Sequence, residues 1–300
     1  MGSLFLAEDN RLPGRMCAIK QVSYNQELSE TIIEQTREQF YREASVLARL
    51  DHPNLPKVSD FFSGTDSDYL VMDYVPGEDL KTIMDRTRRE GRLLDDVDVM
   101  QWADQLSYAL IYLHGQDPPV IHRDIKPSNL KITPDGLIKL VDFGLVKQMV
   151  PDEMTITVIQ GRGTALYTPL EQYGGDAGHT DPRSDIYAFG ATLYHLLTNY
   201  PPAEAKQRFL RPNSLPPLRD LNPSVTAHVE QAIQWAMALH PDERPEMMQD
   251  FRDALFGEKK VHLTHSSPNA NQFLETSNND RILVGAATLL LLVAIISSLN

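Results

Sequence analysis

A polar segment near the middle of the chain constrains its structure more than any other feature. It reads His122-Arg123-Asp124-Ile125-Lys126-Pro127-Ser128-Asn129, and Asp142-Phe143-Gly144 follows it. Two short apolar runs, near 130–133 and 137–141, lie between the two motifs and predict short strands. An unrelated polar loop is a poor explanation, because the chance of matching every fixed position of the first motif is on the order of 10⁻⁸ per starting point.

The residue types in these motifs fit one kind of chemistry. Transfer of a phosphoryl group needs a carboxylate near the attacking hydroxyl, cations on the moving phosphate and oxygen ligands for a metal ion. Asp124, Lys126, Asn129 and Asp142 supply that set. Oxygen ligands suit Mg²⁺ or Mn²⁺, so we expect ATP and one of these ions as cofactors.

In these motifs the chain resembles the protein kinase family, over about residues 2–256. The Asp-x-Lys-Pro-x-Asn form resembles the serine/threonine kinases, here of the eukaryotic-like (Hanks) type found in bacteria. The resemblance implies that Asp124 is the catalytic base, that Lys126 lies near the γ-phosphate, and that Asn129 and Asp142 hold Mg²⁺. It also implies protein substrates that carry Ser or Thr.

Further residues of an ATP site follow from the same resemblance. Ala18-Ile19-Lys20 resembles the family's Val-Ala-Ile-Lys, and strand alternation puts Ala18 and Lys20 on one face. The resemblance implies that Ala18 lines the adenine pocket, that Lys20 reaches the α- and β-phosphates, and that Glu43 pairs with Lys20. A lone lysine in a strand is usually just exposed, so the motif order carries this assignment.

The segment that ends in Pro76-Gly77 resembles the hinge between the two kinase lobes. The resemblance makes Met72 the gatekeeper, assigns adenine binding to the backbones of Asp73 and Val75, and places Leu130 below the ring. Taken alone, the segment is only a buried strand that runs into a turn.

The glycine-rich loop of the family is present only in its second half. Gly2 matches its last glycine, and Leu4 matches the residue over adenine. We therefore interpret the chain as truncated within this loop, with no first strand. Either the true start lies upstream of Met1, or the chain is a fragment with weakened ATP binding. In the second case a catalytically impaired pseudokinase or scaffold is the alternative function.

Several residues resemble structural and regulatory positions of the family. Glu171 is expected to pair with Arg244, Asp185 to brace the catalytic loop, and Thr164 to lie near Asp124 and Lys126. The usual Ala-Pro-Glu is altered, because Leu170 separates Pro169 from Glu171.

A regulatory hypothesis follows from charge. A phosphate carries roughly −1.5 to −2 charge at neutral pH and pairs well with arginine. We expect phosphorylation of Thr155, Thr157 or both to order the loop after Asp142 onto Arg123. Ordinary loop threonines are the alternative.

The predicted architecture is an α+β fold with two lobes. A β-rich N-lobe with one helix, at about 28–50, covers residues 1–75, and a mainly helical C-lobe covers 76–256. Residues 257–281 predict a flexible juxtamembrane linker, because they are polar with little apolar content. A small-molecule kinase is disfavoured by the long segment that ends at Glu171, which resembles a platform for protein substrates.

The run 282–299 has no charged side chain and predicts one transmembrane helix. A helix of that length rises about 27 Å, close to the roughly 30 Å hydrocarbon core of a bilayer. Lys259, Lys260 and Arg281 precede it, which predicts a single-pass protein of the cell membrane with its kinase domain in the cytoplasm. A buried core helix is the alternative.

The composition of the chain limits the classes of partner and of covalent cross-link that are expected. The chain has 28 basic and 41 acidic side chains and a formal net charge of −13, so it is poorly suited to nucleic acid. Its single cysteine, Cys17, allows no disulfide within the chain. Dimerisation for autophosphorylation is a further expectation that the sequence leaves open.

Overall fold

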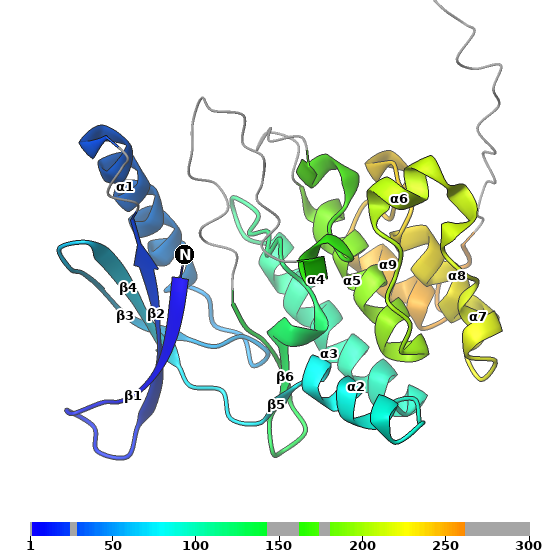
Figure 1. Ribbon diagram of the computed structural model, residues 1–300, viewed down its shortest axis with the longest axis horizontal. Helices are drawn as coiled ribbons and strands as arrows, with labels where there is room; N and C mark the ends of the chain where they lie inside the picture. Colours follow the sequence, from blue (N-terminus) through cyan, green and yellow to red (C-terminus); the bar gives the residue numbers. More distant parts are fainter. Residues whose placement is uncertain (1, 25–28, 143–161, 174–180, 262–300) are drawn as a thin grey trace, which may run out of the picture. The chain divides into compact units, whose positions relative to one another are not determined.

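Two short apolar runs and the turn between them begin the first sheet. The computed structural model (Figure 1) describes residues 2–24, 29–142, 162–173 and 181–261. Strands β1 (Gly2–Glu8) and β2 (Met16–Ser23) form an antiparallel hairpin. Gly14, just before β2, has φ +85°, which glycine adopts without steric cost.

Two further strands complete this sheet. β3 (Val58–Ser63) and β4 (Ser67–Asp73) pair with each other, and β4 also pairs with β2. The resulting order is β1-β2-β4-β3. In the register between β2 and β4, Ala18 faces Met72 and Lys20 faces Leu70, so the lysine and the predicted gatekeeper lie on adjacent strands.

Helix α1 (Glu30–Leu47) packs beside this sheet (Figure 1). It begins where the Ser29 side chain accepts a hydrogen bond from the amide of Ile32, a contact that satisfies one of the free N–H groups of the first turn. Phe40, Ala44 and Leu47 are buried, as the apolar stripe of the sequence predicts. The β-rich first lobe with one helix is confirmed.

The second lobe is mainly helical, as predicted. Its helices are α2 (Leu80–Arg89), α3 (Asp96–His114), α4 (Arg162–Ala165), α5 (Pro182–Thr198), α6 (Ala205–Leu210), α7 (Leu218–Leu221), α8 (Ala227–Ala236) and α9 (Met248–Leu255). Short 3-10 turns are η1 (Pro127–Asn129), η2 (Leu170–Tyr173), η4 (Pro212–Ser214) and η5 (Pro241–Glu243).

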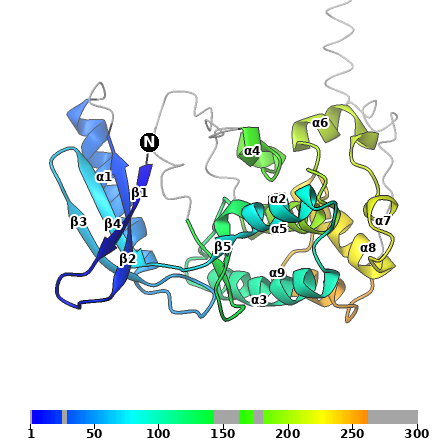
Figure 2. The same cartoon turned by 60° about the horizontal axis from the view of Figure 1, so that its bottom comes forward.

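Helix α5 forms the centre of this lobe. Every residue from 184 to 198 is buried, which is typical of a helix with neighbours on all sides. α5 contacts α3, α8 and α9. A Cβ added at Gly190 would lie 2.8 Å from the Cβ of Ala236 in α8, so the absent side chain permits this close approach. Figure 2 shows α3 and α9 next to each other in this lobe.

A small second sheet positions the polar motifs. Strands β5 (Glu78–Asp79), β6 (Leu130–Ile132) and β7 (Ile138–Leu140) pair in the antiparallel order β5-β6-β7. Asn129 directly precedes β6, and Asp142 follows β7 closely. Because β6 and β7 are antiparallel neighbours, the two metal-binding candidates lie at the same end of this sheet.

The predicted membrane span lies outside the described residues, as does most of the predicted linker. In the part of the chain that the structure covers, no helix has the length and apolar character needed to cross a bilayer. Residues up to Val261 form one compact unit, so the two predicted lobes belong to a single unit of the chain.

Candidate active site

The catalytic loop holds its charged side chains together by direct hydrogen bonds. Lys126 Nζ donates to Asp124 Oδ2 at 2.8 Å and to Thr164 Oγ1 at 3.1 Å. Asn129 Nδ2 donates to the Asp124 carbonyl at 2.8 Å and to Asp124 Oδ2 at 3.0 Å. The structure thus brings together the four residues that the sequence expects to meet. Their catalytic roles stay predictions.

Asp185 of α5 braces this loop from below. Its two carboxylate oxygens accept hydrogen bonds from the amides of His122 and Arg123, both at 2.8 Å, and His114 Nε2 lies 3.0 Å from Oδ2. Arg123 has φ +65°, an uncommon conformation for a side-chain-bearing residue that needs support from its surroundings. Asp185 supplies that support, as the resemblance implies.

The ionisation of Asp185 reflects these contacts. Its side chain is fully buried, which opposes the charged form. The hydrogen bond and charge of His114, with the charge and amide of His122, outweigh burial and hold the pKa of Asp185 below its usual range. The brace is therefore an anion at neutral pH.

A cavity of about 320 Å³ lies beside the loop, and it is lined by residues of both sheets and of the segments that connect them. The lining residues are Ser3, Leu4, Ala18, Lys20, Pro56, Met72, Asp73, Tyr74, Val75, Asp79, Ser128, Asn129, Lys131, Val141 and Asp142. This set contains the predicted phosphate-side lysine, both predicted hinge residues and both predicted metal ligands. The cavity is of the size class of small-molecule sites.

Leu130 is the predicted adenine-site residue that does not line this cavity. It is 1% exposed and belongs to the hydrophobic core, whereas Lys131, the next residue in β6, lines the cavity. Successive strand residues point to opposite faces, so only one of the two can face a ligand. Gly2 begins β1 and is not among the lining residues.

Lys20 reaches across the cavity to the second motif. Its ammonium forms an ion pair with Asp142 Oδ1, which joins β2 of the first lobe to the end of β7 in the second. The Asp142 side chain remains 50% exposed, and the residue has φ +63°. A carboxylate that is half open to the cavity can exchange this contact for a metal ion.

Glu43 of α1 was expected to pair with Lys20. In the structure Gln39 Nε2 donates to Glu43 Oε1 at 2.9 Å. Burial raises the pKa of Glu43, and the Gln39 hydrogen bond and the positive charges of Arg123 and Lys20 partly offset this rise. Glu43 therefore feels the catalytic-loop arginine as well as the lysine, and the predicted ion pair stays a prediction.

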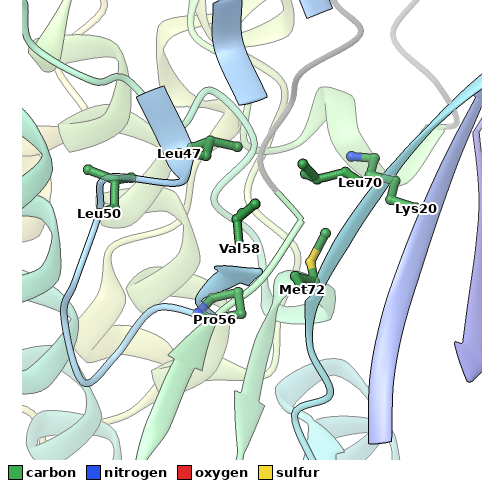
Figure 3. Close-up of a pocket in the computed structure, with 7 residues that line it drawn as sticks. All are labelled: Lys20, Leu47, Leu50, Pro56, Val58, Leu70 and Met72. Atoms are coloured by element: carbon green, nitrogen blue, oxygen red, sulfur yellow. The ribbon is translucent and has the colours of Figure 1, made fainter. Parts of the chain in front are cut away.

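A small apolar pocket lies next to the large cavity, and Figure 3 shows the residues that line it. They are Lys20, Leu47, Leu50, Pro56, Val58, Leu70 and Met72. Its free volume of about 10 Å³ is that of one water molecule. Lys20, Pro56 and Met72 line both cavities, so the Met72 side chain stands between them. This placement fits the predicted gatekeeper.

Asn129 and Asp142 fit a divalent cation by their chemistry. The amide nitrogen of Asn129 is held by Asp124, which leaves its amide oxygen as the acceptor that a hard cation prefers. No cluster of three His, Cys, Asp or Glu side chains suited to a metal occurs in the described part of the chain. Further ligands would come from phosphate oxygens or water, as Mg²⁺ commonly requires.

The predicted pair of Glu171 and Arg244 is present. Arg244 Nη1 and Nη2 donate to Glu171 Oε1 and Oε2 at 2.6 Å and 3.0 Å. The Arg244 side chain is fully buried and its guanidinium lies 4.9 Å from the Tyr187 ring centroid. The extra Leu170 before Glu171 therefore does not prevent this two-point contact.

Only some of the expected regulatory residues belong to the described part of the chain. Thr155 and Thr157 lie outside the described residues. Arg123 is described, and burial lowers the pKa of its guanidinium, with the charges of Glu43 and Asp185 opposing that effect. An arginine that is costly to bury and faces carboxylates can exchange one of them for a phosphate.

Sequence reasoning missed two charged residues of the cavity, Asp79 and Lys131. Asp79 caps α2, because its carboxylate accepts from the amide and the hydroxyl of Thr82, both at 2.9 Å. An aspartate directly before the first apolar residue, here Leu80, indicates such a cap. Lys131 became identifiable only once the structure showed that Leu130 is buried.

A model of the protein kinase domain family matches residues 2–256. The chain is 32% identical over 258 residues to a probable serine/threonine-protein kinase PknB of Corynebacterium glutamicum, covering 81% of this chain and 38% of that protein. It is 31% identical over 240 residues to the tyrosine-protein kinase MasK of Myxococcus xanthus, covering 76% of this chain and 37% of that protein. The chain thus spans less than two fifths of these relatives' length.

Solved structures agree with the sequence relatives. The PpkA-294 apo form superposes with a TM-score of 0.69 at 26% identity, covering 85% of this chain and 91% of that one. The PknI kinase domain of Mycobacterium tuberculosis superposes with a TM-score of 0.64 at 27% identity, covering 86% and 92%. Both likenesses extend over the two lobes described above.

Proposed function

Because the chain belongs to the protein kinase family, we propose that it transfers the γ-phosphoryl group of ATP to Ser or Thr hydroxyls of proteins. The observation that carries this proposal is the hydrogen-bonded set of Asp124, Lys126, Asn129 and Thr164 beside a cavity that holds Lys20 and Asp142. Lys20, Asn129 and Asp142 line the cavity, and hydrogen bonds join Asn129 to Asp124 and Asp124 to Lys126. A base, two cations and two oxygen ligands are therefore grouped together, as phosphoryl transfer needs.

In the proposed mechanism each residue has one role. Asp124, oriented by Lys126 and Asn129, accepts the proton of the attacking hydroxyl. Lys126 and Lys20 place positive charge near the phosphates of the nucleotide. Asn129 and Asp142 would hold a divalent ion, Mg²⁺ or Mn²⁺, whose contribution when bound is to neutralise phosphate charge. Positioning and charge stabilisation carry most of the catalysis.

Ser and Thr are the proposed acceptors because Lys126 lies next to the base. Its ammonium bridges Asp124 and Thr164, and the Asp-x-Lys-Pro-x-Asn motif resembles that of serine/threonine kinases. The relative named as a tyrosine kinase makes this a point to test. Phosphoamino-acid analysis of labelled products should give phosphoserine or phosphothreonine, and phosphotyrosine as the main product would refute the assignment.

The decisive assay is phosphate transfer from labelled ATP with the full chain and Mg²⁺, with Asp142→Asn as the inactive control. Label on a generic Ser/Thr substrate or on the chain itself, absent in the control, supports the enzyme. Nucleotide binding without any transfer would favour the alternative, a scaffold that binds partners without turnover.

We also propose regulation at Thr155 and Thr157, whose phosphates would pair with Arg123. Replacing both threonines with alanine should lower kcat several-fold after pre-incubation with ATP. The matched control is Thr65→Ala, outside the site. Equal activity of the double variant and the unmodified chain would contradict the proposal.

Residues 282–299 are proposed to anchor the kinase to the cell membrane, with the kinase domain on the cytoplasmic side. The support is the uncharged apolar run and the preceding Lys259, Lys260 and Arg281. The full chain should sediment with membranes and resist extraction by high salt, while a chain ending at residue 281 should not. Dimerisation through this segment would show as cross-linking in the full chain alone.

A further inference from the structure

Lys131 brings a positive charge to the end of the cavity that is proposed to bind adenine. The proposed mechanism uses no positive charge there. It lies in the middle of β6, is half-buried and lines the cavity. Its ammonium donates a hydrogen bond to the carbonyl of Val75 at 2.7 Å and lies 5.5 Å from the Tyr74 ring centroid. Lys131 therefore connects the second lobe to the segment proposed to bind adenine.

The backbone conformation of Val75 determines which way its amide and its carbonyl point. Val75 precedes Pro76, and a residue before proline is restricted to extended backbone conformations. In an extended chain the N–H and C=O of one residue point to the same side. The Val75 amide proposed to bind the base and the carbonyl held by Lys131 thus face the same way, and both residues line the cavity.

A purine that accepts a hydrogen bond at N1 from the Val75 amide presents its 2-position toward the Val75 carbonyl. Adenine carries only a hydrogen at this position, whereas guanine and 2,6-diaminopurine carry an amino group. An amino group there needs an acceptor. The Lys131 ammonium already donates to that carbonyl, so an amino group that approaches the same oxygen must compete with it. Lys131 itself presents only donors and a positive charge to that amino group.

We propose that Lys131 is a specificity-determining residue, which rejects purines that carry a 2-amino group by holding the Val75 carbonyl. The inference rests on the proposed function of the cavity as an ATP site. An amino group that must share its acceptor with a neighbouring ammonium is poorly hydrogen-bonded and costs about tenfold in affinity, since a poorly satisfied polar group is expensive once water is excluded.

If the Lys131–Val75 hydrogen bond served only to link the two lobes, a different outcome would be expected. Loss of such a link would weaken or strengthen all purine nucleotides by the same factor. A specificity role predicts a change in the ratio of two affinities, with the nucleotides differing only at the 2-position. The ratio is therefore the quantity to measure.

The experiment is equilibrium binding of ADP and of 2-amino-ADP to the full chain with Mg²⁺, by titration calorimetry. The unmodified chain should bind ADP about tenfold more tightly than 2-amino-ADP. Lys131→Met and Lys131→Leu, which remove the ammonium and free the carbonyl, should reduce that ratio to about two or less. Lys131→Arg, which keeps the charge and donors, should retain it.

Lys139→Met is the matched control. Lys139 is the cross-strand partner of Lys131 in β7, and its ammonium also donates to a backbone carbonyl, that of Leu55 at 3.3 Å. It does not line the cavity, so the ratio should stay at about ten. The control therefore distinguishes a general effect of losing one positive charge from this sheet from the specific effect of losing the Lys131 ammonium.

Two results would overturn the inference. One is equal binding of the two nucleotides by the unmodified chain. The other is a ratio in both Lys131→Met and Lys131→Leu that matches the unmodified chain. Either result leaves the kinase proposal standing if ADP binds and phosphate is transferred. Absence of ADP binding altogether would refute the nucleotide site and this inference together.

Discussion

The catalytic loop and the Lys20–Asp142 contact border the same cavity but are built in opposite ways. Asp124 is 9% exposed, and its carboxylate and carbonyl accept hydrogen bonds from Lys126 and Asn129 within the loop. The buried Asp185 of α5 holds the amide of the preceding residue, Arg123. Asp142 is 50% exposed in its side chain, and the ion pair that it forms comes from the other lobe.

The difference teaches which part of the site is preorganised. A buried carboxylate that is hydrogen-bonded within its own loop is held in place by its surroundings, so the base has its position before any substrate arrives. An exposed ion pair contributes little stability and can be replaced by ligand contacts. The catalytic loop is therefore expected to govern kcat and stability, and the Lys20–Asp142 contact to govern nucleotide affinity.

The largest expected effect separates these two sides directly. Asp124→Asn should lower kcat by about 10²–10⁴-fold, because proton transfer to a positioned base contributes about that much. The dissociation constant of ADP should change by less than about threefold, since Asp124 is not among the residues lining the cavity. Steady-state kinetics and calorimetry check this pair of values. A comparable loss in both would show that the two sides are not separable.

The next effect is on stability. Asp185→Asn should lower the free energy of unfolding by about 3 kcal/mol, because the buried carboxylate would be replaced by an amide whose NH₂ faces other donors. Lys20→Met should cost about 1 kcal/mol or less, since its partner Asp142 is exposed. Urea denaturation of both variants measures the difference, and similar losses would break the comparison.

The loss of stability at acidic pH should reflect another buried titratable residue of α5, His195. Burial, with the charges of Lys81 and Arg88, lowers the pKa of His195 to about 4, and its Nδ1 lies 2.7 Å from the Tyr167 hydroxyl. The folded state therefore binds its proton later than the unfolded state as pH falls. Stability should be complete above about pH 6.5 and should fall by about 2 kcal/mol between pH 6.5 and 4.

His195→Gln is the test of that assignment. It should remove most of this pH dependence in denaturation curves recorded between pH 7 and 4. An unchanged slope in the variant would mean that other groups, such as the carboxylates of the second lobe, cause the acid loss.

The smallest expected effect compares a buried ion pair with an exposed one. Arg244→Lys should cost about 2 kcal/mol, because the fully buried side chain loses its two-point contact with Glu171. Lys81→Met, which breaks an exposed pair with Asp85 in α2, should cost about 0.5 kcal/mol or less. Thermal or urea unfolding resolves the two, and equal costs would contradict the role assigned to burial.

Much of the fold follows from local sequence patterns. The β-rich first lobe with one helix and the mainly helical second lobe were predicted, because the spacing of apolar residues indicates the type of element. Helix α2 was not predicted separately, since Lys81 to Arg89 are mostly polar. It is defined by the cap at Asp79 and by the burial of Leu80 and Met84, a tertiary contact that local patterns do not contain.

The site was predictable to the extent that motifs carry it. Asp124, Lys126 and Asn129 lie within a few positions of one another, so their meeting needs only a loop of suitable shape. The choice between Leu130 and Lys131 could not be made from the motif, because either face of a short strand can turn to the core. Packing decided it, since the core at that point accepts a leucine and not an ammonium.

The sequence by itself determined the family, the chemistry of the catalytic loop and the order of the main elements. Those depend on residue type and spacing, which are properties of the chain alone. Only the tertiary structure decided that Lys20 contacts Asp142 and that Lys131 faces the cavity. These contacts join residues far apart in the chain, and the competition of side chains for burial and hydrogen bonds selects them.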